Sequence, residues 1–203
     1  MKKHLLFFLP FVISCFISLN LFSQASIGPI FTTDPTCFGN ADGSASVNIN
    51  QTSPLTNLKI QLFIQNPNNG VWAPQGTSYG QNNAFNFTSL ADGFYRVVLT
   101  DTATGANLGQ SFFPINNPPQ LILSVSTVDV DCFGDSNGSA SATVSGGTPP
   151  LTYSWSNNTS NSTLNNNNLS AGTYNFIVED DNVCSNSSIY TINEPAQLQP
   201  NGS

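Results

Sequence analysis

The sequence predicts an all-β protein made of two tandem β-sandwich modules that follow an export signal. Three observations lead to this prediction: one series of motifs occurs twice, apolar side chains alternate with polar ones in each copy, and turn-forming residues separate the alternating segments. The chain has 203 residues, including 15 Gly and 13 Pro, which suffices for one or two small domains. After residue 25 no segment has the apolar periodicity of a helix.

The first 25 residues have the three regions of a secretory signal peptide. Lys2 and Lys3 form a basic start, residues 5–22 are mostly apolar, and Ser23 and Ala25 are the small residues that signal cleavage requires. We therefore expect cleavage after Ala25 and a secreted or cell-surface protein.

The leader has two alternatives to a cleaved signal, and its sequence disfavours both. A membrane anchor is disfavoured because Pro10 and Asn20 weaken a spanning helix. A lipid-modified Cys15 is disfavoured because residues 16–22 remain mostly apolar, whereas a lipoprotein turns polar after its cysteine. No later segment is long and apolar enough to predict a membrane span.

The exported chain is acidic and lacks the groups of common catalytic centres. Lys59 and Arg96 are its only basic side chains against eleven Asp and Glu, which excludes nucleic acid as a partner. The single histidine, His4, lies in the leader, so no imidazole is left for a nucleophilic centre or a zinc site. Asp180 and Asp181 are adjacent and would point to opposite faces of a strand, unlike a glycosidase pair. We expect no enzyme and no catalytic residues.

An internal repeat defines the domain organisation. The string CFGNADGSAS at residues 37–46 recurs as CFGDSNGSAS at 132–141, and the pattern LxxGxYxxx[VL]xD covers both 90–101 and 169–180. Each copy closes on a similar segment, INNPPQL at 115–121 and INEPAQL at 192–198. The predicted domains are the leader at 1–25, a divergent first module at 26–121, a second module at 122–198, and 199–203 as a tail or the start of a further repeat.

Within each copy the apolar residues recur with period two, as in half-buried strands. Predicted strands lie at 44–49, 58–65, 84–87, 95–99 and 108–115 in the first copy, and at 139–145, 151–156, 174–178 and 187–192 in the second. The first copy is longer, and we expect its extra residues between Gln51 and Ala84, where residues 66–70 indicate a hairpin turn. Tyr95 and Tyr174 each follow an LxxG segment, as in a tyrosine corner.

The second copy resembles the SprB repeat. The motifs CxGDxxGS, GGTPPLTYSWS, LxAGTY, VxDxxxC and IxxP follow one another in that order from about Cys132 to Leu198. The GGTPPLTYSW stretch is also similar to PKD-type Ig-like modules, which implies an Ig-like or PKD-like sandwich. SprB repeats occur in tandem in very large surface adhesins of gliding bacteria. The resemblance therefore implies an exported repeat protein, part of an adhesin or filament that mediates surface adhesion or gliding motility, with neighbouring repeats as its partners.

The resemblance carries over structural positions only. It implies a disulfide between Cys132 and Cys184 and structural roles for a further set of residues, namely Gly134, Gly138, Gly172, Tyr174 and Asp180, with Gly93, Tyr95 and Asp101 at the matching positions of the first copy. The first copy has no cysteine near residues 104–106 and no GGTPP string, so Cys37 is left unpaired. Cys37 could bond another chain, bond a module beyond Ser203, or be buried as a small apolar side chain.

Two groups of residues could form ligand sites, and each also has a structural explanation. Asp129, Asp131 and Asp135 supply the oxygen ligands that calcium prefers, but their spacing is not that of a calcium loop and also fits ordinary Asx turns. Trp72 and Trp155, with Tyr79 and Tyr153, could stack on sugars, although a large aromatic in a sandwich more often belongs to the core. The alternative function is therefore a secreted carbohydrate-binding module that binds a surface polysaccharide or another extracellular polymer.

Overall fold

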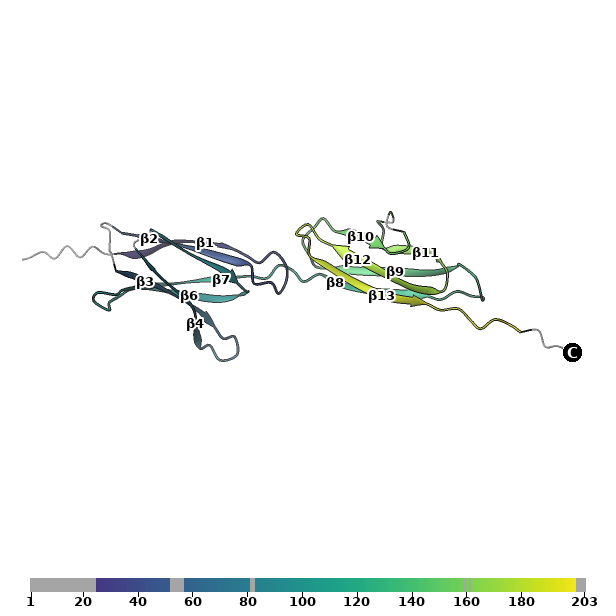
Figure 1. The fold of residues 1–203 in the computed structure, drawn as a ribbon, viewed down its shortest axis with the longest axis horizontal. Helices are drawn as coiled ribbons and strands as arrows, with labels where there is room; N and C mark the ends of the chain where they lie inside the picture. Colours follow the sequence, from purple (N-terminus) through teal and green to yellow (C-terminus); the bar gives the residue numbers. More distant parts are fainter. Residues whose placement is uncertain (1–24, 52–56, 81–82, 159, 161, 200–203) are drawn as a thin grey trace, which may run out of the picture.

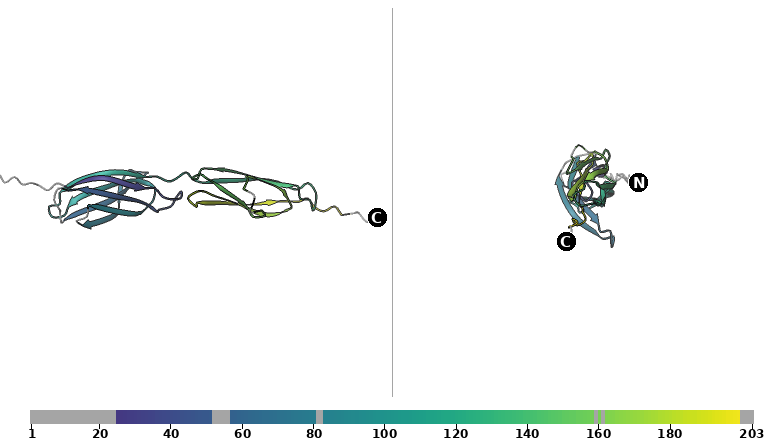
Figure 2. Two further views of the ribbon diagram at one scale, coloured as in Figure 1. Left: turned by 90° about the horizontal axis from the view of Figure 1, so that it is seen from above. Right: turned by 90° about the vertical axis from the view of Figure 1, so that its right-hand side faces the viewer.

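Two β-sandwiches follow one another along the long axis of the molecule (Figures 1 and 2). The structure is a computed structural model that describes residues 25–51, 57–80, 83–158, 160 and 162–199. These ranges contain thirteen strands and no helix, so the all-β prediction is confirmed. The predicted signal peptide lies outside the described residues except for Ala25, which is buried in the first core. In the described ranges nothing forms a helix long and apolar enough to cross a membrane.

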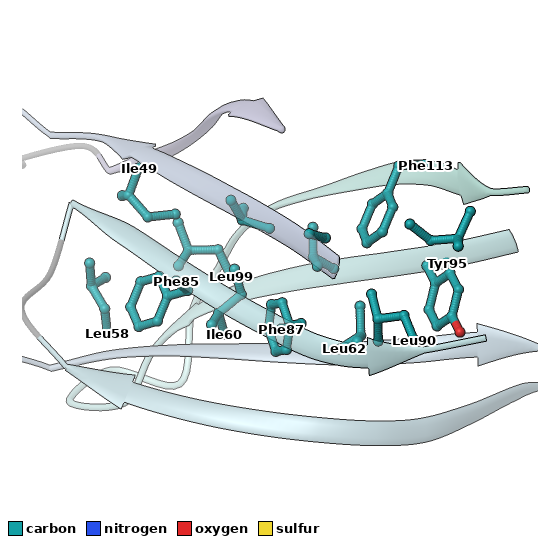
Figure 3. Close-up of a cluster of buried hydrophobic side chains, with 14 of the residues drawn as sticks. Ile49, Leu58, Ile60, Leu62, Phe85, Phe87, Leu90, Tyr95, Leu99 and Phe113 are labelled. Carbon is teal, nitrogen blue, oxygen red and sulfur yellow. The ribbon is translucent and has the colours of Figure 1, made fainter. Parts of the chain in front are cut away.

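The first module has two antiparallel sheets, with strand orders β1-β2-β5 and β4-β3-β6-β7. Its strands are β1 (Ser26–Thr33), β2 (Gly43–Asn50), β3 (Leu58–Gln65), β4 (Trp72–Gly80), β5 (Ala84–Leu90), β6 (Gly93–Asp101) and β7 (Asn107–Ile115). Alternate residues of β2, β3 and β6 are buried, as the period-two pattern predicts. Figure 3 shows these side chains meeting between the two sheets.

The second module repeats this architecture with one strand fewer. Its sheets have the orders β11-β9-β8 and β10-β12-β13. Its strands are β8 (Ile122–Val128), β9 (Gly138–Ser145), β10 (Thr152–Trp155), β11 (Asn165–Leu169), β12 (Gly172–Glu179) and β13 (Ser185–Ile192). Trp155 and Phe176 are fully buried at its centre, with ring centroids 4.3 Å apart.

The extra residues of the first module form the β3–β4 hairpin, as the sequence predicts. β4 pairs with β3 from Gly80↔Leu58 to Trp72↔Gln65, and the N–H of Gly70 donates to the carbonyl of Asn66 in the turn. β10, which matches β3, is instead the edge of its sheet.

Both predicted tyrosine corners are present. The Tyr95 hydroxyl donates to the carbonyl of Ala91 at 2.9 Å, and the Tyr174 hydroxyl donates to the carbonyl of Ser170 at 2.8 Å. Each bond reaches back four residues and ties the start of a central strand, β6 or β12, to the preceding turn. Gly172 packs against the Tyr174 ring, with 3.6 Å from an ideal Cβ to the nearest ring carbon.

Matching glycines at the starts of β2 and β9 allow the sheets to close. An ideal Cβ on Gly43 would lie 2.8 Å from the carbonyl oxygen of Leu90, and one on Gly138 would lie 2.7 Å from the Ile192 side chain. A side chain therefore cannot be accommodated at either position without a shift of the neighbouring strand, which gives the predicted structural residue Gly138 its role.

Candidate functional site

A disulfide between the two modules is the main feature of the junction. Cys37, in the loop between β1 and β2, bonds Cys184, in the loop between β12 and β13, with 5.6 Å between their Cα atoms. The predicted Cys132–Cys184 pair is therefore wrong, and Cys37 is not left unpaired. Cys132 is a free, exposed cysteine.

The reason lies in the topology of the second module. Cys184 directly precedes β13, whereas the loop that carries Cys132 is fastened to the other end of β13, because the N–H of Val130 donates to the carbonyl of Asn193. A strand of this length spans about 26 Å at roughly 3.3 Å per residue. A disulfide requires Cα atoms within about 7 Å of each other, so Cys132 and Cys184 cannot reach each other.

Asp180 organises the loop that presents Cys184. This carboxylate is 7% exposed and accepts backbone N–H groups from Thr148 at 2.9 Å, Asn182 at 3.0 Å and Cys184 at 2.9 Å. Burial raises the pKa of Asp180, but these three N–H donors outweigh it and bring the pKa below its usual value. The predicted structural role of Asp180 is thus to hold the cysteine loop. Asp101, at the matching position of the first module, accepts the N–H of Ala103 in a loop without a cysteine.

The segment between the modules packs closely on the second module. The N–H of Gly147 donates to the carbonyl of Pro119 at 3.1 Å, and the Asn186 amide donates to the carbonyl of Leu121 at 2.9 Å. An ideal Cβ on Gly146 would lie only 1.9 Å from the carbonyl oxygen of Gln120. Glycine is therefore required at Gly146, because the linker passes directly over the Gly-Gly pair and leaves no room for a Cβ.

A side chain of the second module also contacts the backbone of the first module beside the disulfide. The Asn182 amide donates to the carbonyl of Thr36 at 3.2 Å and to the hydroxyl of Thr148 at 3.2 Å. Leu121, which the sequence places at the end of the first module, packs in the core of the second. A hollow at the junction is lined by both modules, including Phe38, Asn40, Pro118, Val183 and Ser185. The sequence patterns did not point to Thr36 or Asn182, because contacts between modules leave no periodic signal.

The loop that carries Cys132 has the same internal geometry as the loop that carries Cys37. Gly39 and Gly134 both have φ +81°, a conformation that favours glycine. The N–H of Gly39 donates to the Asn117 side chain at 3.0 Å, and the N–H of Gly134 donates to the Glu194 carboxylate at 2.9 Å. The predicted structural position Gly134 therefore shapes a loop that is built alike in both modules.

The three acidic residues proposed as calcium ligands belong to this loop, and the carboxylates of Asp129 and Asp131 accept hydrogen bonds. Asp129 accepts the N–H of Asn193 at 2.8 Å, which lowers the pKa of this carboxyl, and Asp131 accepts the Asn137 amide at 2.8 Å. In the described ranges no group of three or more His, Cys, Asp or Glu lies close enough to hold a metal. Asp34 in the first module accepts the N–H of Asn116 in the same way as Asp129 accepts that of Asn193, so each carboxylate ties the loop after the first strand of its module to the segment after the last strand.

Trp72 lies in an aromatic cluster on the four-stranded sheet of the first module. Its ring centroid is 6.0 Å from that of Phe94 and 5.7 Å from that of Phe112, and these two phenylalanines are nearly half exposed. The Arg96 guanidinium lies 4.8 Å from the ring centroids of both Trp72 and Phe63. The cluster offers partly exposed aromatic faces to solvent, and the Arg96 guanidinium lies against them with its Nε buried.

The other aromatic candidates do not form such a surface. Trp155 is fully buried and its Nε1 donates to the carbonyl of Thr163 at 2.8 Å, so stacking of a ligand on Trp155 is excluded. Tyr153 is half-buried against Phe176, and the side chain of Tyr79 lies outside the described part of the structure.

Comparison with protein families finds one match within each module. The SprB repeat family matches residues 30–51 and 124–160. The two matches begin within β1 and within β8, at corresponding places in the two sandwiches. A search of curated proteins finds no match.

Comparison with solved structures finds matches of low identity and low TM-score. A C-terminal fragment of intimin, solved with the intimin-binding domain of the translocated intimin receptor, is 15% identical, with a TM-score of 0.39 and coverage of 84% of this chain. The chain spans 64% of that fragment's length. An amphioxus IgVJ-C2 molecule is 14% identical with a TM-score of 0.30, covering 76% of this chain and 97% of the other. A β-glucuronidase from glycoside hydrolase family 2 is 12% identical with a TM-score of 0.28, and the match covers 87% of this chain and 21% of the enzyme.

Proposed function

Because the chain carries SprB repeat sequence in both of its modules, we propose that it is an exported, non-enzymatic part of a cell-surface adhesin or filament. The observation that carries this proposal is the covalent junction, in which one disulfide and a closely packed linker fix two sandwiches end to end (Figure 1). A stack of modules fixed in this way resists bending and can hold binding surfaces away from the cell. Many weak contacts then add through effective concentration.

The charge and composition of the exported chain support the same function. A protein with two basic side chains against eleven acids remains soluble and repels other copies of itself, which suits a densely displayed array. A bond between modules also suits the oxidising environment outside the cytoplasm, where disulfides persist.

Surface labelling together with an adhesion assay tests this proposal. Antibodies against residues 26–198 should label intact cells, and deletion of the gene should reduce attachment to glass or polymer several-fold, with recovery on complementation. Colony spreading of the same strains tests a role in gliding. Labelling only after permeabilisation, or unchanged attachment and spreading, would contradict the proposal.

The aromatic cluster around Trp72 favours a second candidate function, binding of a surface polysaccharide. Sugar rings stack on exposed aromatic faces, and Arg96 adds a positive charge that suits acidic sugars. Affinity electrophoresis in neutral and acidic polysaccharides should show retardation that Trp72→Ala reduces at least several-fold. The matched control is Phe31→Ala, because Phe31 is 63% exposed on the other sheet of the same module. Equal retardation of both variants would exclude the cluster as the binding site.

A further inference from the structure

The far end of the second module repeats the surface that the first module uses at the junction. Cys132, Phe133 and the segment 195–198 occupy the repeat positions of Cys37, Phe38 and the segment 118–121. Asp131, Cys132, Phe133 and residues 195–198 line a hollow at this end. The corresponding hollow at the junction has the same wall from the first module, and the second module supplies its other wall.

One residue shows what this end surface lacks. Leu121 is 9% exposed because it inserts into the core of the following module, whereas Leu198, its repeat equivalent, is 93% exposed. Exposure of a leucine to this degree leaves nearly all of its apolar surface in water. The end surface therefore has an apolar residue and a free thiol in the places where the junction has a buried residue and a disulfide.

The loop that carries Cys132 has the backbone geometry of the Cys37 loop at the junction, although Cys132 has no disulfide partner in the described structure. The N–H of Asp135 donates to the carbonyl of Cys132 at 3.1 Å, as the N–H of Asn40 donates to the carbonyl of Cys37 at 3.0 Å. A loop that needs no rearrangement to bind has a lower entropic cost of association.

We propose that this end surface, formed by Cys132, Phe133 and residues 195–198, binds a further module of the second module's type and forms a disulfide with its loop cysteine. The partner must have a Gly-Gly pair where the linker passes, as at Gly146 and Gly147, and a DxxxC loop like that from Asp180 to Cys184. The inference deepens the proposed function by naming the partner of this surface.

The same requirements exclude the first module as this partner. Its corresponding loop, closed by the bond from the N–H of Gly105 to the carbonyl of Asp101, contains no cysteine. Its sequence also lacks the Gly-Gly pair. Head-to-tail addition of a second copy of this chain would therefore form no disulfide, and the first module cannot accept a bond from a preceding module.

Formation of the proposed disulfide between Cys132 and the incoming module requires an oxidant that itself contains a disulfide. The Cys132 thiolate attacks the disulfide of a thiol–disulfide oxidoreductase or of oxidised glutathione, forms a mixed disulfide and releases one thiolate. The thiolate of the incoming module attacks the Cys132 sulfur, forms the inter-module bond and releases the oxidant as its second thiolate. Two protons and two electrons thus pass from the two cysteines to the oxidant.

Peptide mapping of the native protein tests the proposal directly. Cells are treated with iodoacetamide, and the protein is isolated without reductant and digested with proteases that cleave at acidic and aromatic residues. Trypsin is unsuitable because no Lys or Arg follows Arg96, so Cys132 and Cys184 would stay on one fragment. Cys37 linked to Cys184 serves as the internal control.

The expected result is that most Cys132 is linked to a peptide with a DxxxC sequence and that alkylated Cys132 is a minor species. Alkylated Cys132, a Cys132–Cys184 link, a symmetric Cys132–Cys132 link or a small-thiol adduct as the main species would each overturn the proposal. These results concern one covalent bond and leave the adhesion test unaffected, so the two proposals can fail separately.

Reconstitution tests whether docking directs the bond. The chain is extended by placing a second copy of residues 122–203 directly after Leu198, so that Leu198 takes the position of Leu121. Under oxidised glutathione, Cys132 should lose reactivity toward iodoacetamide, and Cys184→Ser in the added copy should restore it. Gly146→Ala in the added copy should slow the bond at least tenfold, because its Cβ would collide with the linker. Equal rates with and without this change would contradict directed docking.

Discussion

At the scale of single residues, the junction depends on side chains that hold a backbone loop in place. Asp180 is the clearest case, because one carboxylate accepts three N–H groups of the loop that presents Cys184. The sequence identified this residue through the repeat pattern, but gave no reason for its presence. The reason is that a short loop between β12 and β13 leaves N–H groups without strand partners, and a buried donor without a partner is costly.

Replacement of Asp180 should therefore destabilise the second module and the junction. Asp180→Asn removes the charge and one acceptor oxygen, and we expect a loss of roughly 2 kcal/mol in the free energy of unfolding. Urea unfolding followed by tryptophan fluorescence measures the change, since Trp155 is buried in this module. Asp181→Asn is the matched control, because Asp181 is exposed. Equal midpoints for both variants would mean that the carboxylate does not hold the loop.

Acid should weaken the protein through several carboxylates of this kind. Hydrogen bonds from Thr36 lower the pKa of Asp42, that from Ala103 lowers the pKa of Asp101, and that from Asn193 lowers the pKa of Asp129. A carboxyl group whose pKa is lower in the folded than in the unfolded protein stabilises the fold. Its full contribution is present at pH values above the pKa in the unfolded chain, about 3.9 for Asp, and is lost as the pH falls through the pKa in the folded protein. The urea midpoint should thus stay level from pH 7 to about 5 and decline toward pH 2.5. A midpoint that rises on acidification would refute this assignment.

At the scale of strands and loops, the alternation of apolar residues predicted most of the sandwich. The strands at 58–65 and 108–115 agree with β3 and β7 to within one residue. β1, β8 and β11 were not predicted, and β4 was expected only as part of a hairpin, without bounds. β11 reads NNNNL, and asparagine disfavours strands, so local propensity pointed away from the observed structure. Pairing with β9 and burial of Leu169 and Asn166 determine this strand instead.

The tyrosine corners make a matched pair of tests at this scale. Tyr174→Phe and Tyr95→Phe each remove one hydroxyl that bonds a carbonyl four residues earlier, and keep the ring. We expect each change to cost about 1 kcal/mol, a typical net value for one hydrogen bond. Thermal unfolding measures both, with Tyr153→Phe as a control of the same chemistry. A cost below that of the control would show that the corner hydroxyls do not fasten these strands.

At the scale of the whole molecule, one disulfide joins two modules whose cores are separate. The Cys37–Cys184 bond has a sequence separation of 147 residues, yet each core is formed almost entirely by its own strands. The bond therefore limits the relative orientation of the modules more than it stabilises either sandwich. The linker contacts at Gly147 and Asn186 contribute to the same constraint.

Removal of Cys37 separates this connectivity from the one expected from the sequence. In the Cys37→Ser variant, both Cys132 and Cys184 should react with iodoacetamide, because the length of β13 keeps them about 26 Å apart. Both modules should remain folded, while the distance distribution between spin labels on the two modules broadens. The control, Cys132→Ser, should keep the Cys37–Cys184 bond and a narrow distribution. Formation of a Cys132–Cys184 bond in Cys37→Ser would contradict the observed topology.

The sequence by itself determined the repeat, the strand pattern, the added hairpin and the residues that recur at each turn. These features depend on interactions within a few residues or on alternation along a strand, and both can be recognised in short segments of the sequence. The tertiary structure alone decided which cysteines bond and which tryptophan is buried. Which cysteines bond depends on the end of the sandwich at which each cysteine loop lies. Which tryptophan is buried depends on the sheet that packs opposite it. Cys37 and Cys184 therefore meet across two modules, while Cys132 remains exposed at the far end.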